Sequence, residues 1–574
     1  MAKSAAIQQK NLEKIFYPES LVVVGANKVQ GTVPADIIFN ILKTDFQGIV
    51  YPVSPREHFI SGIKCHKYVA DIVDPVDLAI LVFPSSVCHL AMEQCGEKGI
   101  KSVIIISAGF KEVGGIGLER EKQIKEIADK YDMSFIGPNC LGVINTDPKA
   151  LLNASFARKM PTEGSIAFLS QSGALCTAVL DYAQAKHIGF SKFVSFGNKA
   201  DISEIDLLYY LKDDPKTKVI LVYLEEISDG PGLMKAAREI ITETGKPILA
   251  LKSGRTKEGA SAAASHTGSL AGSDEIVDAA FEQAGIIRCD NIEEMFNIAI
   301  AMTYQSLPSN NRVAIITNAG GPGVLTTDAV IHDGLQLAHF SDETTDIFRK
   351  SLPKTANIKN PVDVIGDARA DRYHVAVSNA LKDENVDGVF VILTPQSMTD
   401  IEKIAEEICL VSGHYEKPLY TSFMGESDVA AGIDILQRHK IPHYILPESM
   451  SKSFARAYQF KQRLGKEWTQ AAAFDDVDRE KAQSILKEAR KNKRKYLPEG
   501  EAVEVLKAYG FPVSPGGVAK SEAEAVSIAE KIGFPVVMKV FSDDIVHKFD
   551  VKGVYLNVNS AKEAREAYQA IHKN

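Results

Sequence analysis

Apolar residues near the N-terminus gather into short runs that alternate with amphipathic stretches. These runs predict strands buried on both faces, at residues 20–24, 48–53, 78–83 and 102–107. After the first run, Gly25 and Gly31 open a turn, Thr32 can cap a helix, and positions 37, 38, 41 and 42 form one apolar helical face. The alternation predicts a doubly wound α/β sheet, with helices on both faces and ligands at the carboxyl ends of its strands.

The same order of elements begins twice more along the chain. An apolar strand from residue 164, the turn SQSG at 170–173 and a helix open a unit that runs to about residue 305. A strand at 312–317, the turn NAGGPG at 318–323 and a helix open another that runs to about residue 460. This similarity predicts two related α/β units.

The last part of the chain has a different pattern. A polar, basic segment at 490–501 predicts a helix end and a linker, and a helix, a strand and a hairpin-like stretch follow near 501–509, 536–541 and Gly553. The expected organisation is therefore 1–150, 151–307, 308–465, a linker at 466–496, and an incomplete domain at 497–574.

Composition narrows the class of protein. At 574 residues the chain is too long for one hydrophobic core, and 45% apolar with 24% charged residues is ordinary for a soluble globular protein. A net charge of −9 argues against non-specific nucleic-acid binding. No apolar run reaches the roughly 18 residues of a membrane span, and the first residues lack the apolar core of a secretory signal. Seven scattered cysteines without a metal-type pair favour a reduced, cytoplasmic location and no protein-bound metal.

One histidine, His266, lies in a run made almost wholly of Gly, Ala, Ser and Thr, at residues 259–274. Small residues let the backbone approach a ligand closely and leave amide and hydroxyl donors uncovered. A histidine that accepts and passes on a phosphoryl group needs such donors around an exposed ring nitrogen. The run therefore indicates a phosphorylated histidine; the alternative is a solvated histidine in a flexible surface loop.

The small-residue turns between strand and helix are a second indication of phosphate chemistry. Unpaired amides at a helix N-terminus, together with the positive end of the helix dipole, form a site for anions. Neither turn ends in the Gly-Lys-Ser/Thr of a P-loop, and residues 25–31 do not spell the dinucleotide fingerprint GxGxxG. A simple kinase and a nicotinamide enzyme are therefore not supported.

Seven short motifs make the indication more specific. They are SAGFKE at 107–112, IGPNCLG at 136–142, SQSG at 170–173, GNKAD at 197–201, YLE at 223–225, SHTGSLAG at 265–272 and NPVD at 360–363. With them, essentially the whole chain resembles the nucleoside-diphosphate-forming (ADP-forming) acyl-CoA synthetases, relatives of succinyl-CoA synthetase. The resemblance implies a CoA-binding doubly wound (Rossmann-like) domain, two flavodoxin-like ligase domains and the first part of an ATP-grasp domain.

The resemblance also implies catalytic roles. His266 matches the phosphorylated histidine, and Glu225 matches the carboxylate that orients it, which fixes the tautomer while the other ring nitrogen attacks phosphorus. Glu226, next to it, stands where family members often have glycine. The two small-residue turns resemble helix N-termini that face each other across the phosphohistidine. The phosphate contacts implied there are Ser170, Ser172, Gly173, Gly320, Gly321 and Gly323.

The first domain resembles the CoA-binding domain of this family. The residues expected to contact CoA are Gly25, Asn27, Ser54, Pro55, Arg56, Pro84, Gly109, Phe110 and Asn139. Arg56 offers a cation for a CoA phosphate and is equally compatible with a solvated surface position.

The C-terminal segment resembles the start of an ATP-grasp domain. Lys539 matches a lysine that reaches nucleotide phosphates, and His547 matches a second histidine that carries phosphate between distant sites in some of these synthetases. Phe549 and Lys552 depart from the small hydroxyl residue and the glycine usual near that histidine. The chain ends before the second lobe and its acidic Mg²⁺ ligands, so it is expected to be a fragment or to need a partner.

The function implied is reversible synthesis of acyl-CoA from a carboxylic acid, CoA and ATP, with ADP and phosphate as products, through phosphohistidine and acyl phosphate. The acid is expected to be acetate or a short hydroxy acid such as 3-hydroxypropionate or 4-hydroxybutyrate. A homodimer that binds no nucleic acid and no membrane is expected. The alternatives are a CoA-binding regulatory or acyltransferase-associated scaffold, against which His266 and Glu225 argue, and a subunit that needs a partner for nucleotide binding.

Overall fold

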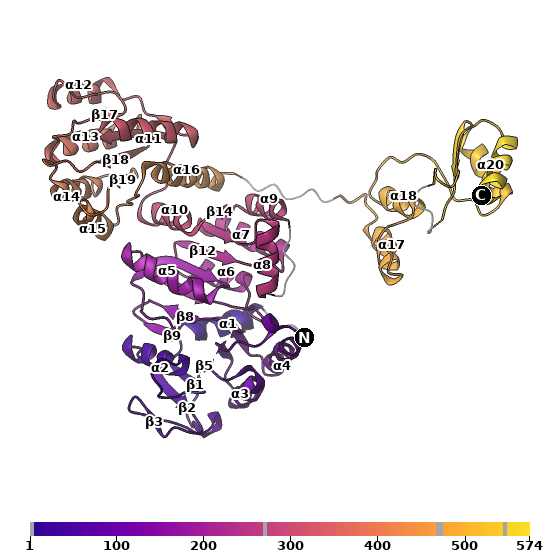
Figure 1. Cartoon of the computed structure of the whole chain (residues 1–574), viewed down its shortest axis with the longest axis horizontal. Helices are drawn as coiled ribbons and strands as arrows, with labels where there is room; N and C mark the ends of the chain where they lie inside the picture. The colour runs from indigo at the N-terminus through magenta and orange to yellow at the C-terminus, as the bar shows by residue number, and fades with distance from the viewer. Residues whose placement is uncertain (1–4, 268–272, 467–473, 543–547, 574) are drawn as a thin grey trace. The chain divides into compact units, whose positions relative to one another are not determined.

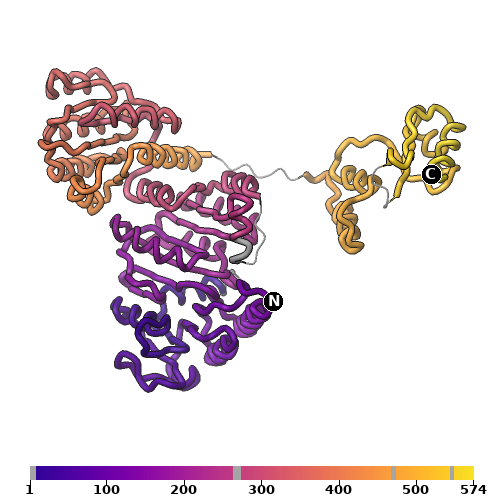
Figure 2. Tube along the Cα trace, viewed as in Figure 1, coloured from indigo at the N-terminus to yellow at the C-terminus, as the bar shows by residue number. Residues whose placement is uncertain are grey.

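The computed structural model describes residues 5–267, 273–466, 474–542 and 548–573. The chain divides into two compact units, Met1–Lys466 and Glu467–Asn574. The first unit holds three large β-sheets, which the chain passes through in sequence order (Figures 1 and 2), and one small hairpin. Among the helices of the described ranges, none combines the length and the apolar content that a membrane crossing requires.

The first sheet contains five parallel strands in the order β2-β1-β5-β6-β7. The strands are β1 (Ser20–Val24), β2 (Ile49–Val53), β5 (Leu78–Leu81), β6 (Ser102–Ile105) and β7 (Ser134–Ile136), and a small hairpin, β3 (Phe59–Ile60) with β4 (Ile63–Lys64), follows β2. Alternate residues of β1 enter different apolar clusters, since Leu21 and Val23 join that of α2, whereas Val22 and Val24 join that of α3 and α4. The sheet is therefore buried on both faces, as the doubly wound prediction requires.

Helices of this part of the chain flank the sheet or precede it. They are α1 (Ala5–Phe16), α2 (Val33–Lys43), α3 (Ser85–Lys98) and α4 (Ile116–Lys130), with the short helices η1 (Val69–Asp71) and η2 (Lys111–Val113). Thr32 stands at the N-cap of α2, as its position predicts, but its hydroxyl does not cap the helix. It donates instead to Asn27 Oδ1 (2.9 Å), because the tight turn brings that oxygen within reach.

The second sheet has seven strands in the order β14-β13-β12-β10-β11-β8-β9. Its parallel part is β10 (Glu163–Ser170), β11 (Phe190–Ser195), β12 (Val219–Leu224), β13 (Ile248–Lys252) and β14 (Ile287–Arg288). The hairpin of β8 (Gly142–Asn145) and β9 (Leu152–Ser155) adds to it antiparallel to β11. The boundary expected at residue 150 falls inside this hairpin, because its ladder with β11 draws the segment into the second sheet.

The helices of the second sheet are α5 (Gly173–Ala185), α6 (Glu204–Asp213), α7 (Gly230–Thr244), α8 (Lys257–Thr267), α9 (Asp274–Ala284) and α10 (Ile292–Tyr304). The helix α8 occupies the first half of the run of small residues around His266, where a loop was the alternative expectation. Four alanines in this segment explain the helix, since alanine has the highest helix propensity and outweighs the single glycine.

The third sheet is wholly parallel, in the order β16-β15-β18-β19 with β17 also on β15. Its strands are β15 (Arg312–Thr317), β16 (Gln336–Leu337), β17 (Val362–Asp363), β18 (Gly388–Leu393) and β19 (Leu419–Phe423). Its helices are α11 (Gly320–His332), α12 (Asp342–Ser351), α13 (Ala370–Lys382), α14 (Ile401–Ser412), α15 (Ala430–Arg438) and α16 (Pro447–Leu464). The helix α16 packs on both α10 and α11, which joins the third sheet to the second.

The second unit is small and has its own core. It contains α17 (Arg479–Lys491), α18 (Glu499–Ala508), α19 (Glu522–Ile532), β20 (Val536–Lys539), β21 (Val554–Val558) and α20 (Ala561–Lys573). The strands β20 and β21 form an antiparallel pair, and Val526, Val536 and Val558 lie in the core against α20. The segment expected to be a linker, 466–496, contains the helix α17. This helix packs against α18 and so belongs to the small unit.

Candidate active site

The residues expected to contact CoA lie in the loops that follow β1, β2, β5, β6 and β7. These strands are parallel, so their carboxyl ends meet at one edge of the first sheet, where doubly wound folds bind ligands. Hydrogen bonds join neighbouring loops, since the Gly25 amide donates to Val53 O (3.1 Å) and the Asn139 amide donates to Ser107 O (2.9 Å). The structure thus brings residues that are far apart in sequence to a common edge.

Individual members of this group differ in what they can offer a ligand. Pro55, Arg56 and Pro84 are exposed, whereas Ser54 is buried. The ring of Phe110 is completely buried in the core that contains α3 and α4, so this residue can present only its backbone. The sequence did not reveal this, because an aromatic residue in a glycine-containing motif suits a core and a ligand site equally.

Gly109 is required by the packing around it. Its φ is +102°, and a Cβ at this position would lie 2.4 Å from Ser85 Oγ. The carboxylate of Glu112 accepts hydrogen bonds from the amides of Gly109 (2.5 Å) and Phe110 (3.2 Å). Glu112, which the sequence placed in a motif without a role, therefore organises this loop.

The two turns expected to bind phosphate share one hydrogen-bond arrangement. The hydroxyls of Ser170 and Thr317, the last residues of β10 and β15, accept from the amide two residues later (3.0 and 3.1 Å). The same hydroxyls donate to the carbonyl of that residue (3.0 and 2.9 Å). Ser172 then caps α5 by accepting from the Leu175 amide (3.3 Å), whereas the first turn of α11 receives no side-chain cap.

A second repeated feature fixes the loop that carries Glu225. Gln171 Oε1 accepts hydrogen bonds from the amides of Glu225 (2.6 Å) and Glu226 (2.9 Å), just after β12. At the equivalent place after β15, Asn318 Oδ1 accepts from the Thr394 amide (2.9 Å), just after β18. In both sheets, therefore, an amide side chain after one strand pins the end of the neighbouring strand.

A pocket lies beside Glu225, at the boundary between the first and second sheets. We call it the Glu225 pocket, and its lining residues are Lys111, Asn139, Gln171, Gly197, Asn198, Glu225 and Glu226. Asn139 belongs both to this pocket and to the loops expected to contact CoA. Within the described residues the lining includes nothing from the turn at 318–323, so convergence of both turns on one phosphate stays a prediction.

Asn198, in the lining of the Glu225 pocket, bridges two neighbouring acids whose pKa values shift in opposite directions. Asn198 Nδ2 donates to Glu112 Oε2 (2.6 Å) and to Glu121 Oε2 (3.1 Å). Burial acts to raise the pKa of Glu112, but bonds from Asn198 and from the Gly109 and Phe110 amides outweigh it and hold that pKa below its usual value. Burial dominates at Glu121 and raises its pKa. Hydrogen bonds therefore prevail at Glu112, and burial prevails at Glu121.

The backbone of Gly197 fits closely against the loop that carries Asn139. Its φ is +52°, and a Cβ would lie 2.3 Å from Pro138 O and 2.4 Å from Asn139 O. Lys199, with φ +48°, donates to the carbonyl of Glu226 (2.8 Å) and forms a buried ion pair with Glu204 (3.0 Å). The GNKAD motif therefore connects both sides of the pocket.

His266 lies in the last turn of α8, and its side chain is outside what the structure describes. The helix follows β13, which pairs in parallel with β12, and it contacts η2 of the first sheet. The two sides of the run of small residues are tied together by Arg255, whose Nε lies 3.4 Å from Asp274 Oδ2. The helix α8 therefore begins near the strand edge that carries Glu225 and contacts η2.

In the second unit, Lys539 forms an ion pair with Glu499, whose other carboxylate oxygen lies 3.1 Å from Lys548 Nζ. The hydrogen bond from Lys539 and that from Lys548 lower the pKa of Glu499, against its partial burial. His547 lies outside the described residues. Phe549 is exposed, and Lys552 adopts φ +51° in the turn where the family usually has glycine.

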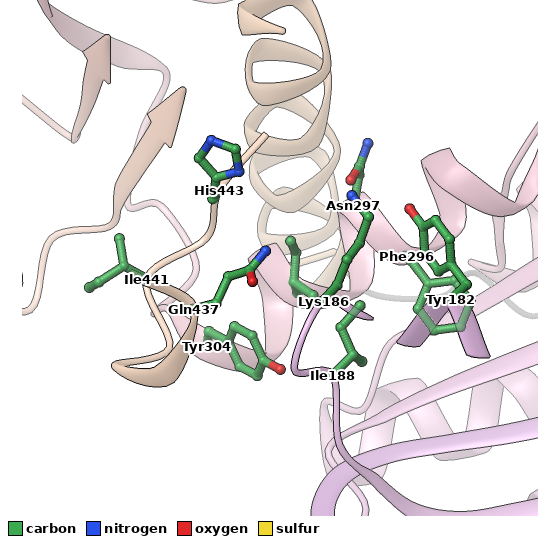
Figure 3. A pocket seen from close by; sticks show the side chains of 10 residues that line it. Tyr182, Lys186, Ile188, Phe296, Asn297, Tyr304, Gln437, Ile441 and His443 are labelled. Atoms are coloured by element: carbon green, nitrogen blue, oxygen red, sulfur yellow. The ribbon is translucent and has the colours of Figure 1, made fainter. Parts of the chain in front are cut away.

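A second pocket lies where the elements of the second and third sheets meet (Figure 3). Tyr182 comes from α5 and Lys186 directly follows that helix, whereas Gln437 and His443 belong to the segments around the third sheet. Burial lowers the pKa of His443 to about 4, although the hydrogen bond between its ring and the Phe423 backbone acts to raise it. No residue expected to take part in catalysis lines this pocket among those described, and we assign it to the contact between the two sheets.

Most residues that line the Glu225 pocket were given no role by the sequence analysis. Lys111, Gln171 and Asn198 all lie in quoted motifs, in the segments that follow β6, β10 and β11, and position beyond a strand end was the signal that could have found them. Among the described residues no group of three or more His, Cys, Asp or Glu side chains could hold a metal ion.

Four family models match successive parts of the chain. They describe a CoA binding domain at residues 19–146, a succinyl-CoA ligase like flavodoxin domain at 163–302, a ligase-CoA domain at 313–463 and an ATP-grasp domain at 488–574. Their order agrees with the fold class expected from the motifs.

Curated proteins and solved structures agree with these models. The ADP-forming 4-hydroxybutyrate–CoA ligase of Nitrosopumilus maritimus is 42% identical over 563 residues, 98% of this chain and 80% of the relative. The ADP-forming acetate–CoA ligase I of Archaeoglobus fulgidus is 41% identical over 547 residues, 95% of this chain and 78% of the relative. The dinucleotide forming acetyl-coenzyme A synthetase 1 of Ca. Korarchaeum cryptofilum, in complex with phosphate and ADP, has a TM-score of 0.75 at 36% identity over 79% of this chain and 97% of its own. The chain therefore belongs to the ADP-forming acyl-CoA synthetase family, a family of acid–thiol ligases.

Proposed function

We propose that this protein catalyses the reversible conversion of a carboxylic acid, CoA and ATP to acyl-CoA, ADP and phosphate. The observation that carries the proposal is the position of Glu225 beside a polar pocket and near the helix that carries His266. Glu225 follows β12 and α8 follows the neighbouring strand β13, so Glu225 and the start of α8 lie at one edge of the second sheet. Because α8 also contacts η2, whose Lys111 lines the Glu225 pocket, the arrangement supports phosphorylation of His266 with Glu225 as its orienting carboxylate.

The proposed reaction begins when the γ-phosphoryl group of ATP is transferred to His266 and ADP leaves, and two further transfers follow. In the synthetic direction, a carboxylate oxygen of the acid attacks the phosphorus of phosphorylated His266, the N–P bond breaks, and an acyl phosphate forms. The CoA sulfur then attacks the acyl carbon, the C–O bond to phosphorus breaks on the acyl side, and phosphate leaves. Amide dipoles at the turns of residues 170–173 and 320–323 would stabilise the phosphoryl oxygens in both steps, which suits a site rich in backbone donors.

The remaining parts of the proposal concern the ligands on either side of this reaction. The loops at the edge of the first sheet, from Gly25 to Asn139, would hold CoA, and Lys539 would bind nucleotide phosphates, with Mg²⁺ accompanying the nucleotide. His547 would carry phosphate between the nucleotide and the acyl site. The acid proposed is acetate or a short hydroxy acid such as 3-hydroxypropionate or 4-hydroxybutyrate, which the acids named for the two relatives support.

We also propose a homodimer in the cytoplasm. The family resemblance supports the homodimer. The seven cysteines, all free thiols in the structure, support a reducing compartment.

Phosphate transfer to the protein tests the proposal. Acetyl, propionyl and 3-hydroxypropionyl phosphate, labelled in the phosphoryl group, are incubated with the full chain, and the label is then challenged with acid. We expect acid-labile label that is lost in His266→Ala and kept in His414→Ala, a control at an exposed histidine beyond α14. Absence of label with every donor, from protein that binds CoA, would contradict the synthetase and favour the CoA-binding scaffold.

A further inference from the structure

The Glu225 pocket lies between Asn139, one of the residues proposed to contact CoA, and Glu225, the proposed partner of His266, so the acyl group of the proposed reaction would be transferred there. Its lining is unusual for an acyl site. Its seven lining residues are one glycine and six residues with charged or carboxamide side chains; none is aliphatic or aromatic. An alkyl or aryl acid placed there would remove water from these groups without replacing the lost hydrogen bonds, which costs free energy. The lining therefore favours an acyl group that carries its own polar substituent.

One ion pair in the pocket shows which substituent fits. Lys111 Nζ lies 3.2 Å from Glu226 Oε2, and the side chains retain 27% and 21% of their exposure. Lys111 comes from η2 of the first sheet, whereas Glu226 follows β12 of the second, so the pair spans the pocket. A ligand there meets an ammonium donor and a carboxylate acceptor side by side.

The backbone of Glu226 is fixed on both sides. Its amide donates to Gln171 Oε1 (2.9 Å), and its carbonyl accepts from Lys199 Nζ (2.8 Å). Lys199 is itself held by the buried carboxylate of Glu204. The carboxylate of Glu226 therefore starts from a fixed position at the pocket, which is what recognition of a specific group requires.

We propose that Lys111 and Glu226 select an acid that carries a hydroxyl group on a short chain. A hydroxyl both donates and accepts, so it can donate to Glu226 and accept from Lys111 at once. A methyl group in its place would separate the pair and satisfy neither partner, and sites built for a hydroxyl reject analogues that lack it. This inference rests on the proposed synthetase function and names the class of its acid.

The test runs the reaction from acyl-CoA, without nucleotide. Labelled phosphate attacks the acyl carbon and displaces the CoA thiolate; His266 then attacks phosphorus and displaces the free acid, which leaves the label on the protein. The second-order rate constant of labelling is compared for 3-hydroxypropionyl-CoA and propionyl-CoA, which have equal chain lengths. We expect the hydroxyacyl donor to react at least about 10-fold faster, because a hydrogen bond to a charged group typically changes affinity by about 10- to 100-fold.

Variants test whether the preference for the hydroxyacyl donor depends on Lys111 and Glu226. Glu226→Leu should lower the ratio of the two rate constants by about 10- to 100-fold. The matched control is Glu243→Leu, which breaks the ion pair of Lys212 with Glu243 (2.6 Å), away from the pocket lining; its ratio should equal that of the unmodified protein. Circular dichroism establishes that each variant is folded, and Lys111→Met replaces Glu226→Leu if the latter is not.

The outcomes separate this inference from the proposed function. Label from both donors at similar rates, or a ratio that Glu226→Leu and Lys111→Met leave unchanged, would overturn selection by the pair while the synthetase stands. Absence of label from acetyl-CoA, propionyl-CoA and 3-hydroxypropionyl-CoA would instead overturn the synthetase. A ratio that falls equally in Glu243→Leu would also overturn the inference, because loss of any ion pair would then have the same effect.

Discussion

Replacement of Gln171 by methionine tests whether this side chain positions Glu225. Gln171 is only 9% exposed, and its Oε1 accepts from the amides of Glu225 and Glu226 at 2.6 and 2.9 Å. Methionine keeps the length and most of the volume but offers only a weak sulfur acceptor. The substitution therefore leaves two backbone donors at the end of β12 without their partner.

The size of the effect follows from these contacts. An unsatisfied buried donor costs about 1–3 kcal/mol, and because Glu225 and Glu226 are half-buried, water can replace part of the loss. We expect the free energy of unfolding to fall by about 2 kcal/mol. Glu225 would also shift, and because a displacement of about 1 Å near reacting groups can cost about 100-fold in rate, labelling of the protein from acyl phosphate should slow by about 10- to 100-fold.

The matched control is Asn40→Leu. Asn40 is 7% exposed and also makes two hydrogen bonds to the backbone, to Ser155 O (2.9 Å) and Ala157 O (2.6 Å), but it joins α2 to β9. Urea unfolding should show a comparable loss of stability in both variants, and single-turnover labelling should slow only in Gln171→Met. Equal labelling rates in the two variants, at equal loss of stability, would refute a positioning role for Gln171.

Three further predictions concern charged and titrating groups. Lys199→Met should lower the free energy of unfolding by about 3–5 kcal/mol, because it strands Glu204, whose side chain is 2% exposed; urea titration measures this, and Glu204→Leu added to it should restore most of the loss. Burial lowers the pKa of His443 in the folded protein to about 4, whereas in the unfolded chain this pKa is about 6.5. Between these two pH values the unfolded chain therefore binds more protons than the folded protein. The stability that neutral His443 contributes is therefore complete above about pH 6.5 and falls by about 1.4 kcal/mol per pH unit toward pH 4; His443→Gln should flatten that slope in urea titrations at several pH values. Glu499→Gln should raise the affinity for ATP several-fold by calorimetry if Lys539 binds phosphate, because the ion pair that now occupies Lys539 is lost; an unchanged affinity would argue against that role.

Local patterns predicted a large part of the fold. Apolar runs predicted four of the five strands of the first sheet to within two residues at each end, because strands buried on both faces are continuously apolar; the short edge strand β7 was not predicted. The hairpin of β8 and β9 was missed, since its place depends on pairing with β11, far along the chain. The helix α8 was also missed, because its small residues suggested a loop, whereas its four alanines have a high helix propensity.

Some parts of the candidate site could likewise be found from the sequence, and others needed the tertiary structure. The sequence by itself identified the family, and the resemblance singled out His266 and Glu225 as the proposed catalytic residues, because the motifs that carry it are short and contiguous in the sequence. It could not show that the Phe110 ring is buried in the core, or that Gln171 holds the amides after β12, because both depend on contacts between distant segments. The pairing of Lys111 with Glu226 likewise needs two sheets to meet. Only the tertiary structure decided these points, since the carboxyl ends of parallel strands become neighbours only when their sheets have formed and packed.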